Sequence, residues 1–170
     1  QYQEQGRGGK GKRGMNVRDE DSVREILEAN THGDLLVFTT RGLVYKLPVH
    51  KVPELSRDAR GTPLVNLLEL GGDDAVASVI AVGSQQAADE TDLLFCSRNG
   101  LIKRTRLSEY RNMRTSGLRA YDCADGDRLF KVVPAKTEQH VLILTRRGLS
   151  IRFPGVNEKG ELEVRHTGRV

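Results

Sequence analysis

The sequence predicts an all-β fold of propeller-like blades, each a small four-stranded antiparallel sheet, with about three blades in its 170 residues. Three observations predict it. A hairpin-like segment occurs three times, a strand-like segment precedes each copy, and a basic segment with a glycine follows each copy. Hydrophobic residues make up 37% of the chain and aromatic residues 5%, which fits a lean core of short Val, Leu and Ile strands.

The hairpin segments share four apolar residues, a polar turn that closes on glycine, and a second strand-like run. They are DLLVFTTRGLVYKL from Asp34, DLLFCSRNGLIKRT from Asp92 and HVLILTRRGLSIRF from His140. Glycine at such a turn favours a positive φ, as tight hairpin turns require. The turn glycines are Gly42, Gly100 and Gly148.

Cations recur at fixed places in these hairpins. A cation follows each turn glycine by four residues, which predicts a basic outer strand; these are Lys46, Arg104 and Arg152. Arginines also flank the turns, at Arg41, Arg98, Arg146 and Arg147. Cys96 aligns with Phe38 and Leu144, so we expect it in the core.

A strand is expected before each hairpin. DSVREILEA from Asp21 has helical spacing of its apolar residues when read alone. Its counterpart DRLFKVVPA from Asp127 contains Pro134 and β-branched residues, which favour a strand. Because the two segments share one ungapped register, we predict a strand in both, and another in the segment that begins at Asp74.

A basic glycine loop follows each hairpin, 17 to 20 residues beyond the turn glycine. The loops close on Gly61, Gly117 and Gly168, and arginines stand before them at Arg57, Arg60, Arg111, Arg114 and Arg165. In the same register QGRGGKG, residues 5–11, is a fourth copy of this loop that is enriched in glycine. Glycine allows the backbone to approach a phosphate closely and to offer its N–H groups.

The charge is segregated along the chain. The net charge is +4, yet residues 68–92 carry six acidic residues and no Lys or Arg, while residues 93–121 carry seven basic residues and one acid. A rim of repeated cations predicts a polyphosphate partner. No recognition helix is evident and aromatic residues are few, so we expect contact with the backbone of duplex DNA rather than base reading.

QGRGGKG closely resembles the A-box, Q-R-R-G-G-[R/K]-G, of the C-terminal domain of the DNA gyrase A protein, with Gly6 in place of an arginine. The resemblance extends over residues 1–170. It implies a partial β-pinwheel domain with repeat units of about 5–55, 56–110 and 111–170, which wraps duplex DNA and enables negative supercoiling. Because the first residue is Gln, and Met15 is a poor initiator candidate since the glycine-rich stretch precedes it, we expect the chain to be a fragment.

The resemblance also implies a setting. The partners are duplex DNA, the N-terminal domain of the gyrase A protein and the gyrase B protein, in an A2B2 holoenzyme of the bacterial cytoplasm that associates with the chromosome. This domain is implied to be non-catalytic and free of cofactors, with ATP, magnesium and the strand-cleaving tyrosine in other domains.

The DNA-binding residues predicted from the box and the repeats are all glycines or polar and basic residues. They are Gln5, Gly6, Arg7, Gly8, Gly9, Lys10, Gly11, Lys12, Arg13, Arg41, Lys46, Arg57, Arg60, Arg98, Lys103, Arg104, Arg111, Arg114, Arg146, Arg147 and Arg152.

Several alternatives compete with this assignment. Residues 6–12 nearly match a Walker A loop, but Arg13 stands where Ser or Thr is needed. A disordered RGG-like nucleic-acid-binding tail fits the opening stretch better than a Walker A loop does, but the repeat register disfavours it. The equivalent domain of topoisomerase IV and a propeller-type protein-interaction module also remain open. Cysteine and histidine spacing indicates no metal site, and no segment is apolar enough to span a membrane.

Overall fold

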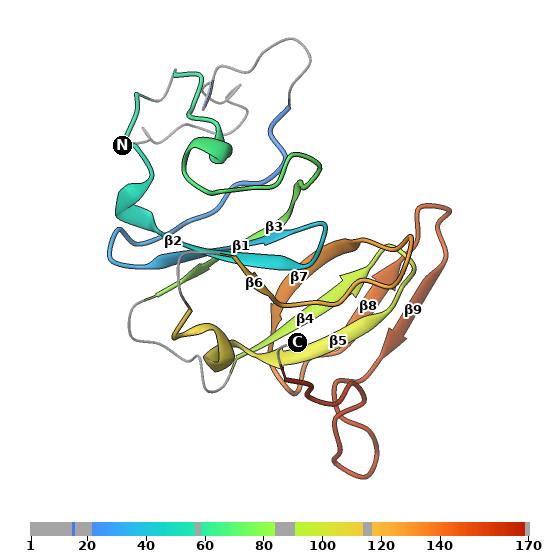
Figure 1. Cartoon of the computed structure of the whole chain (residues 1–170). Coiled ribbons are helices and arrows are strands. Elements are labelled where there is room, and N and C mark those ends of the chain that lie inside the picture. The colour runs from blue at the N-terminus through green and yellow to red at the C-terminus, as the bar shows by residue number, and fades with distance from the viewer. Residues whose placement is uncertain (1–14, 16–21, 57–58, 84–90, 114–116, 169–170) are drawn as a thin grey trace, which may run out of the picture.

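The computed structural model describes residue 15 and residues 22–56, 59–83, 91–113 and 117–168. Within these ranges the chain forms strands, turns and three short 3₁₀ segments, with no α-helix. Figure 1 shows the strands gathered into separate small sheets along the chain. The box residues Gln5–Arg13, together with Arg57 and Arg114, lie outside the described residues.

Each predicted hairpin is present. The hairpin strands are β1 (Asp34–Thr39) with β2 (Leu43–Pro48), β4 (Asp92–Ser97) with β5 (Ile102–Arg106), and β8 (Val141–Leu144) with β9 (Ser150–Phe153). The remaining strands are β3 (Val76–Val82), β6 (Leu118–Arg119) and β7 (Leu129–Ala135). The 3₁₀ segments are η1 (Val49–Lys51), η2 (Leu64–Asn66) and η3 (Leu107–Tyr110).

The sheets are built by strand exchange between consecutive repeats. The first sheet has the order β3-β1-β2-β6, so the hairpin of the first repeat is flanked by strands from the next two segments of the chain. The second sheet has the order β5-β4-β7, and a bridge between Arg104 and His166 adds a backbone contact on its β5 side. The third sheet holds β8 and β9 alone. A blade is therefore not a contiguous stretch of sequence.

The prediction of a strand in DSVREILEA is wrong. Residues 22–30 are exposed and carry no strand. Strand exchange gives the physical reason, since β3 and β7, the counterparts of this segment, each pair with the hairpin of the preceding repeat. Among the described residues β1–β2 is the first hairpin, so residues 22–30 find no preceding hairpin there with which to pair.

The turn glycines are confirmed as left-handed positions, with φ of 82° at Gly42, 86° at Gly100 and 84° at Gly148. In each turn the glycine N–H donates to the carbonyl oxygen three residues earlier, over 3.0 to 3.1 Å. The surroundings of the turns differ. A Cβ at Gly42 would overlap the carbonyl oxygen of Tyr121, whereas a Cβ at Gly100 would meet no atom within 4 Å.

The main core lies between the first two sheets. Leu36, Phe38 and Val44 of β1 and β2 pack against Leu93 and Phe95 of β4. The rings of Phe38 and Phe95 meet edge to face at 5.5 Å between centroids. Ala120 and Tyr121, which follow the second glycine loop, fill the same interface. The loop that follows a hairpin therefore also packs between two sheets.

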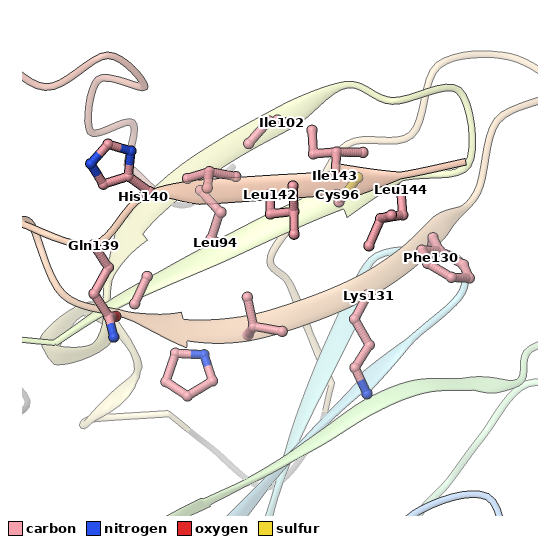
Figure 2. Close-up of a pocket in the computed structure, with 14 residues that line it drawn as sticks. Leu94, Cys96, Ile102, Phe130, Lys131, Gln139, His140, Leu142, Ile143 and Leu144 are labelled. Atoms are coloured by element: carbon pink, nitrogen blue, oxygen red, sulfur yellow. The ribbon is translucent and has the colours of Figure 1, made fainter. Parts of the chain in front are cut away.

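The third hairpin is far more exposed. Leu142 is 58% exposed and Leu144 is 67% exposed, whereas Phe38, at the repeat position of Leu144, is fully buried. Between β4, β7 and β8 lies a largely apolar pocket of about 400 Å³ (Figure 2). Cys96, expected in the core, is half-buried at this pocket. Burial raises the pKa of its thiol and Asp127 adds to the shift, which disfavours a reactive thiolate.

We predict unequal costs for alanine at two equivalent turns. Gly100→Ala should lower the free energy of unfolding by about 1–2 kcal/mol, because alanine must adopt a left-handed φ. Gly42→Ala should cost roughly 1–3 kcal/mol more, because its Cβ also collides with the backbone of residue 121. Urea unfolding of both variants measures the difference, and equal losses would contradict the close approach.

Candidate nucleic-acid interface

The predicted cations fall at two ends of the hairpins rather than on one line. Arg41, Arg98, Arg146 and Arg147 lie at the turns, which point toward the right of the view in Figure 1. The cations four residues after each turn glycine lie near the open ends, about 13 Å along the strand at the usual rise per residue. The predicted cations therefore form two separate groups, one at the turns and one at the open ends.

At the turn end, the four arginines are exposed. The first two turns also hold aspartates from the next repeat. Asp74 Oδ1 accepts hydrogen bonds from Thr40 Oγ1 and the Arg41 N–H, both 3.1 Å long. Asp127 Oδ1 accepts from the Asn99 N–H at 3.2 Å. These carboxylates reduce the positive potential at both turns.

The third turn holds no such carboxylate from the part of the chain that the structure describes. Among the described residues, no Asp or Glu accepts a hydrogen bond from residues 145–149; the turn is closed by Thr145, whose Oγ1 accepts from the Leu149 N–H at 3.0 Å. Arg146 and Arg147 therefore form the strongest uncompensated positive charge at this end of the described chain.

At the open end, the three equivalent cations differ sharply. Lys46 Nζ lies 3.0 Å from Asp34 Oδ2, and its side chain is 26% exposed. Arg104 is fully buried, with Nη1 3.0 Å from Asp92 Oδ2. Arg152 is exposed, and His140 stands where the other two hairpins begin with the aspartate that pairs with the cation.

Arg104 must therefore be removed from the predicted interface. Its side chain does not reach the surface, and the segment at His166 and Thr167 packs beside it. His166 Nε2 lies 2.8 Å from the second carboxylate oxygen of Asp92. A buried arginine needs such a partner, because an uncompensated charge in the interior is strongly destabilising.

Lys103 also points inward. Its Nζ donates to the carbonyl oxygen of Ala120 at 2.9 Å and lies 5.9 Å from the centroid of the Phe95 ring. Burial lowers the pKa of Lys103 from its ordinary value, and the charge of Asp122 opposes the shift. This lysine ties the second glycine loop to the core and is poorly placed to contact a phosphate.

The list of predicted DNA-binding residues omits other exposed cations, although the repeat pattern placed one of them, Arg165, in the third glycine loop. Arg60 and Arg111 were predicted and are exposed, but so are Arg106, Arg128 and Arg165. Arg106 shares a face of β5 with the buried Arg104, so strand alternation gave no signal to separate the two. Residues 166 and 167 pack beside Arg104, which buries it, whereas Arg106 is exposed.

The described residues contain no group of three or more His, Cys, Asp or Glu side chains that could hold a metal ion. In the same part of the chain, no helix is long and apolar enough to cross a membrane.

Comparison with known proteins decides the family. A model described as the DNA gyrase C-terminal domain, beta-propeller, matches residues 1–29, 33–82 and 91–136. This chain belongs to that family. As a gyrase C-terminal domain it has the all-β pinwheel architecture that the repeats predicted.

The relatives of this gyrase domain are bacterial. It is 40% identical over 153 residues to the DNA gyrase A protein of Streptococcus pneumoniae serotype 4, which covers 90% of this chain and 18% of the relative. It is 38% identical over 168 residues to the Clostridium acetobutylicum gyrase A protein, covering 99% and 19%. The chain thus spans less than a quarter of the length of these relatives.

Solved structures share the fold. The C-terminal domain of a DNA topoisomerase IV superimposes with a TM-score of 0.75 at 25% identity, covering 89% of this chain and 45% of that one. A DNA gyrase A C-terminal domain gives a TM-score of 0.68 at 22% identity, covering 99% and 53%.

We predict a pH-dependent contribution from Asp127. Hydrogen bonds from the Ser97 side chain and from the backbone N–H groups of Arg128, Asn99 and Arg98 hold its pKa below the ordinary 3.8, although burial opposes them. The carboxylate therefore stabilises the fold above pH 3.8, and this contribution disappears as the pH falls through the lowered folded-state pKa.

Asp127→Ala should accordingly reduce stability at pH 7, and the difference from the unsubstituted protein should shrink as the pH falls below 3.8. Urea midpoints across this range measure it, with the exposed Asp125→Ala as the control. A difference that stays constant with pH would contradict the role of the charged carboxylate.

Proposed function

We propose that this gyrase C-terminal domain binds duplex DNA with little sequence preference and wraps it around a basic rim, so that the holoenzyme introduces negative supercoils. Family membership supports the proposal. The observation that carries it is the third hairpin, where Arg146, Arg147 and Arg152 are exposed and pair with no carboxylate of the described residues.

Unpaired surface arginines suit a phosphate backbone. Each neutralised phosphate releases condensed counterions, so affinity depends steeply on salt and little on sequence. Sequence then enters through the ease with which the duplex bends. The box residues Gln5–Arg13 add cations and glycines to this rim, with Gly6 removing one cation relative to the usual motif.

The proposal places the domain within an A2B2 assembly with the N-terminal part of the gyrase A protein and with the gyrase B protein, in the bacterial cytoplasm on the chromosome. The domain itself contributes no catalysis and binds no cofactor, and ATP and magnesium act in other domains. Tyr45, Tyr110 and Tyr121 serve packing, since all three are buried.

Two other functions have specific support. The higher TM-score to the topoisomerase IV domain favours the equivalent role in that enzyme. The exposed Leu142 and Leu144 favour a protein-interaction module. The gyrase assignment alone explains the A-box, and a protein-interaction module leaves the exposed cations of the third hairpin unexplained.

A salt titration of duplex binding tests the proposal. We expect log K to fall linearly with log salt, with a slope of about −0.9 per neutralised phosphate. Replacing Arg146 and Arg147 together by alanine should reduce the magnitude of that slope by about 2. Arg119→Ala is the control, because its guanidinium already pairs with Asp122 at 3.2 Å. Absence of binding at low salt would refute duplex binding.

The box has its own test in the complete holoenzyme. Arg7→Ala with Lys10→Ala should abolish wrapping and supercoiling, because phosphate contacts of the box are lost, while relaxation and cleavage by the catalytic domains are largely retained. Supercoiling and relaxation assays on one preparation measure both. Unchanged supercoiling would overturn the role given to these residues.

A further inference from the structure

We infer that the ion pairs Asp34–Lys46 and Asp92–Arg104 are positioning groups, each of which fastens the basic glycine loop of the following repeat against a hairpin. The inference rests on the proposed function, because it concerns how the loop arginines are presented to phosphates. It reassigns two predicted DNA contacts, Lys46 and Arg104, from binding to positioning.

The first pair holds the second glycine loop. Lys46 Nζ contacts Asp34 Oδ2 at 3.0 Å and also donates to the backbone carbonyl oxygen of Arg111 at 3.3 Å. At the far end of the loop, Gly117 lies against the ring of Tyr45, where a Cβ would come within 2.6 Å of Cζ. Leu118 and Arg119 then pair with β2. The loop is thus tied to the first hairpin on both sides.

The second pair holds the third glycine loop in a similar way. Asp92 bridges Arg104 at 3.0 Å and His166 at 2.8 Å. The backbone of Arg104 completes the attachment, since its carbonyl oxygen accepts from the Thr167 N–H at 2.8 Å and from Thr167 Oγ1 at 3.3 Å. Arg165, next to these two anchored residues, remains exposed.

The two attachments share one physical logic. In each, an aspartate at the start of a hairpin restrains a cation of the second hairpin strand, and the next repeat bonds to that assembly. The loop loses less conformational entropy on binding a phosphate when its backbone is already fixed. Charge at position 34 or 46 then acts on DNA through loop geometry rather than through direct contact.

This mechanism makes an unusual prediction for Asp34. Neutralising an acidic residue normally strengthens binding to a polyanion. If Asp34 fixes Lys46 and the loop, Asp34→Asn should instead weaken duplex affinity, by about two- to fivefold for a half-exposed pair. Asp73→Asn, which removes an exposed acid next to Asp74 at the turn end of the same hairpin, is the matched control and should not weaken binding.

The experiment uses the whole chain, with a fluorescent duplex and urea unfolding of every variant. Asp34→Asn and Lys46→Met should each weaken duplex affinity to the same extent, and the double variant should bind no more weakly than either single variant. Lys46→Arg, which keeps the positive charge, should retain the affinity of the unsubstituted chain. In a background of Arg111→Ala and Arg114→Ala, Asp34→Asn should have no further effect. At the third loop, His166→Ala should weaken binding while His166→Gln, which keeps a donor toward Asp92, retains it.

Two failures are distinguishable. Loss of duplex binding in the unsubstituted chain overturns the proposed function and this inference with it. Binding in the unsubstituted chain that Asp34→Asn leaves unchanged or strengthens overturns the inference alone. Hydrogen exchange adds a readout that does not depend on DNA, since amides of residues 117–121 should exchange faster in Asp34→Asn, and unchanged exchange would also overturn it.

Discussion

The structure depends on the pairing of the first two hairpins with strands from later parts of the chain. An unpaired strand edge exposes backbone donors and acceptors, and β1, β2 and β4 each satisfy theirs with β3, β6 or β7. This exchange also closes the main core, because Ala120 and Tyr121, which directly follow β6, pack between the first two sheets. Backbone pairing and core packing are therefore one event.

Charge placement follows from the same exchange. The exposure of a cation at the open end of a hairpin depends on which residues of the following repeat pack against its side chain. Arg104 is buried because residues near His166 reach it, and Asp92 compensates its charge. Arg152 occupies the same repeat position and is exposed. At equivalent repeat positions, the cation thus has a structural role in one sheet and is exposed to solvent in another.

Much of this fold could be predicted from repeats. Gly42, Gly100 and Gly148 marked three hairpins, and the register placed β3 and β7 correctly. The register failed at residues 22–30, because a strand exists only where a partner edge is available. It could not separate Arg104 from Arg152 either, since burial is set by residues from a different repeat. The local sequence pattern therefore predicts the strands and turns, whereas residues of neighbouring repeats determine which side chains are exposed.

The position of β6 beside β2 has a consequence for synthesis on the ribosome. About 70 residues separate these strands along the chain, which at a translation rate of roughly 5–20 residues per second means a delay of several seconds. During that interval the nascent first hairpin presents an open edge at β2. Pairing between strands that lie far apart in the sequence slows folding. The nascent chain must therefore stay soluble, with the edge of β2 unpaired, until β6 has been synthesised.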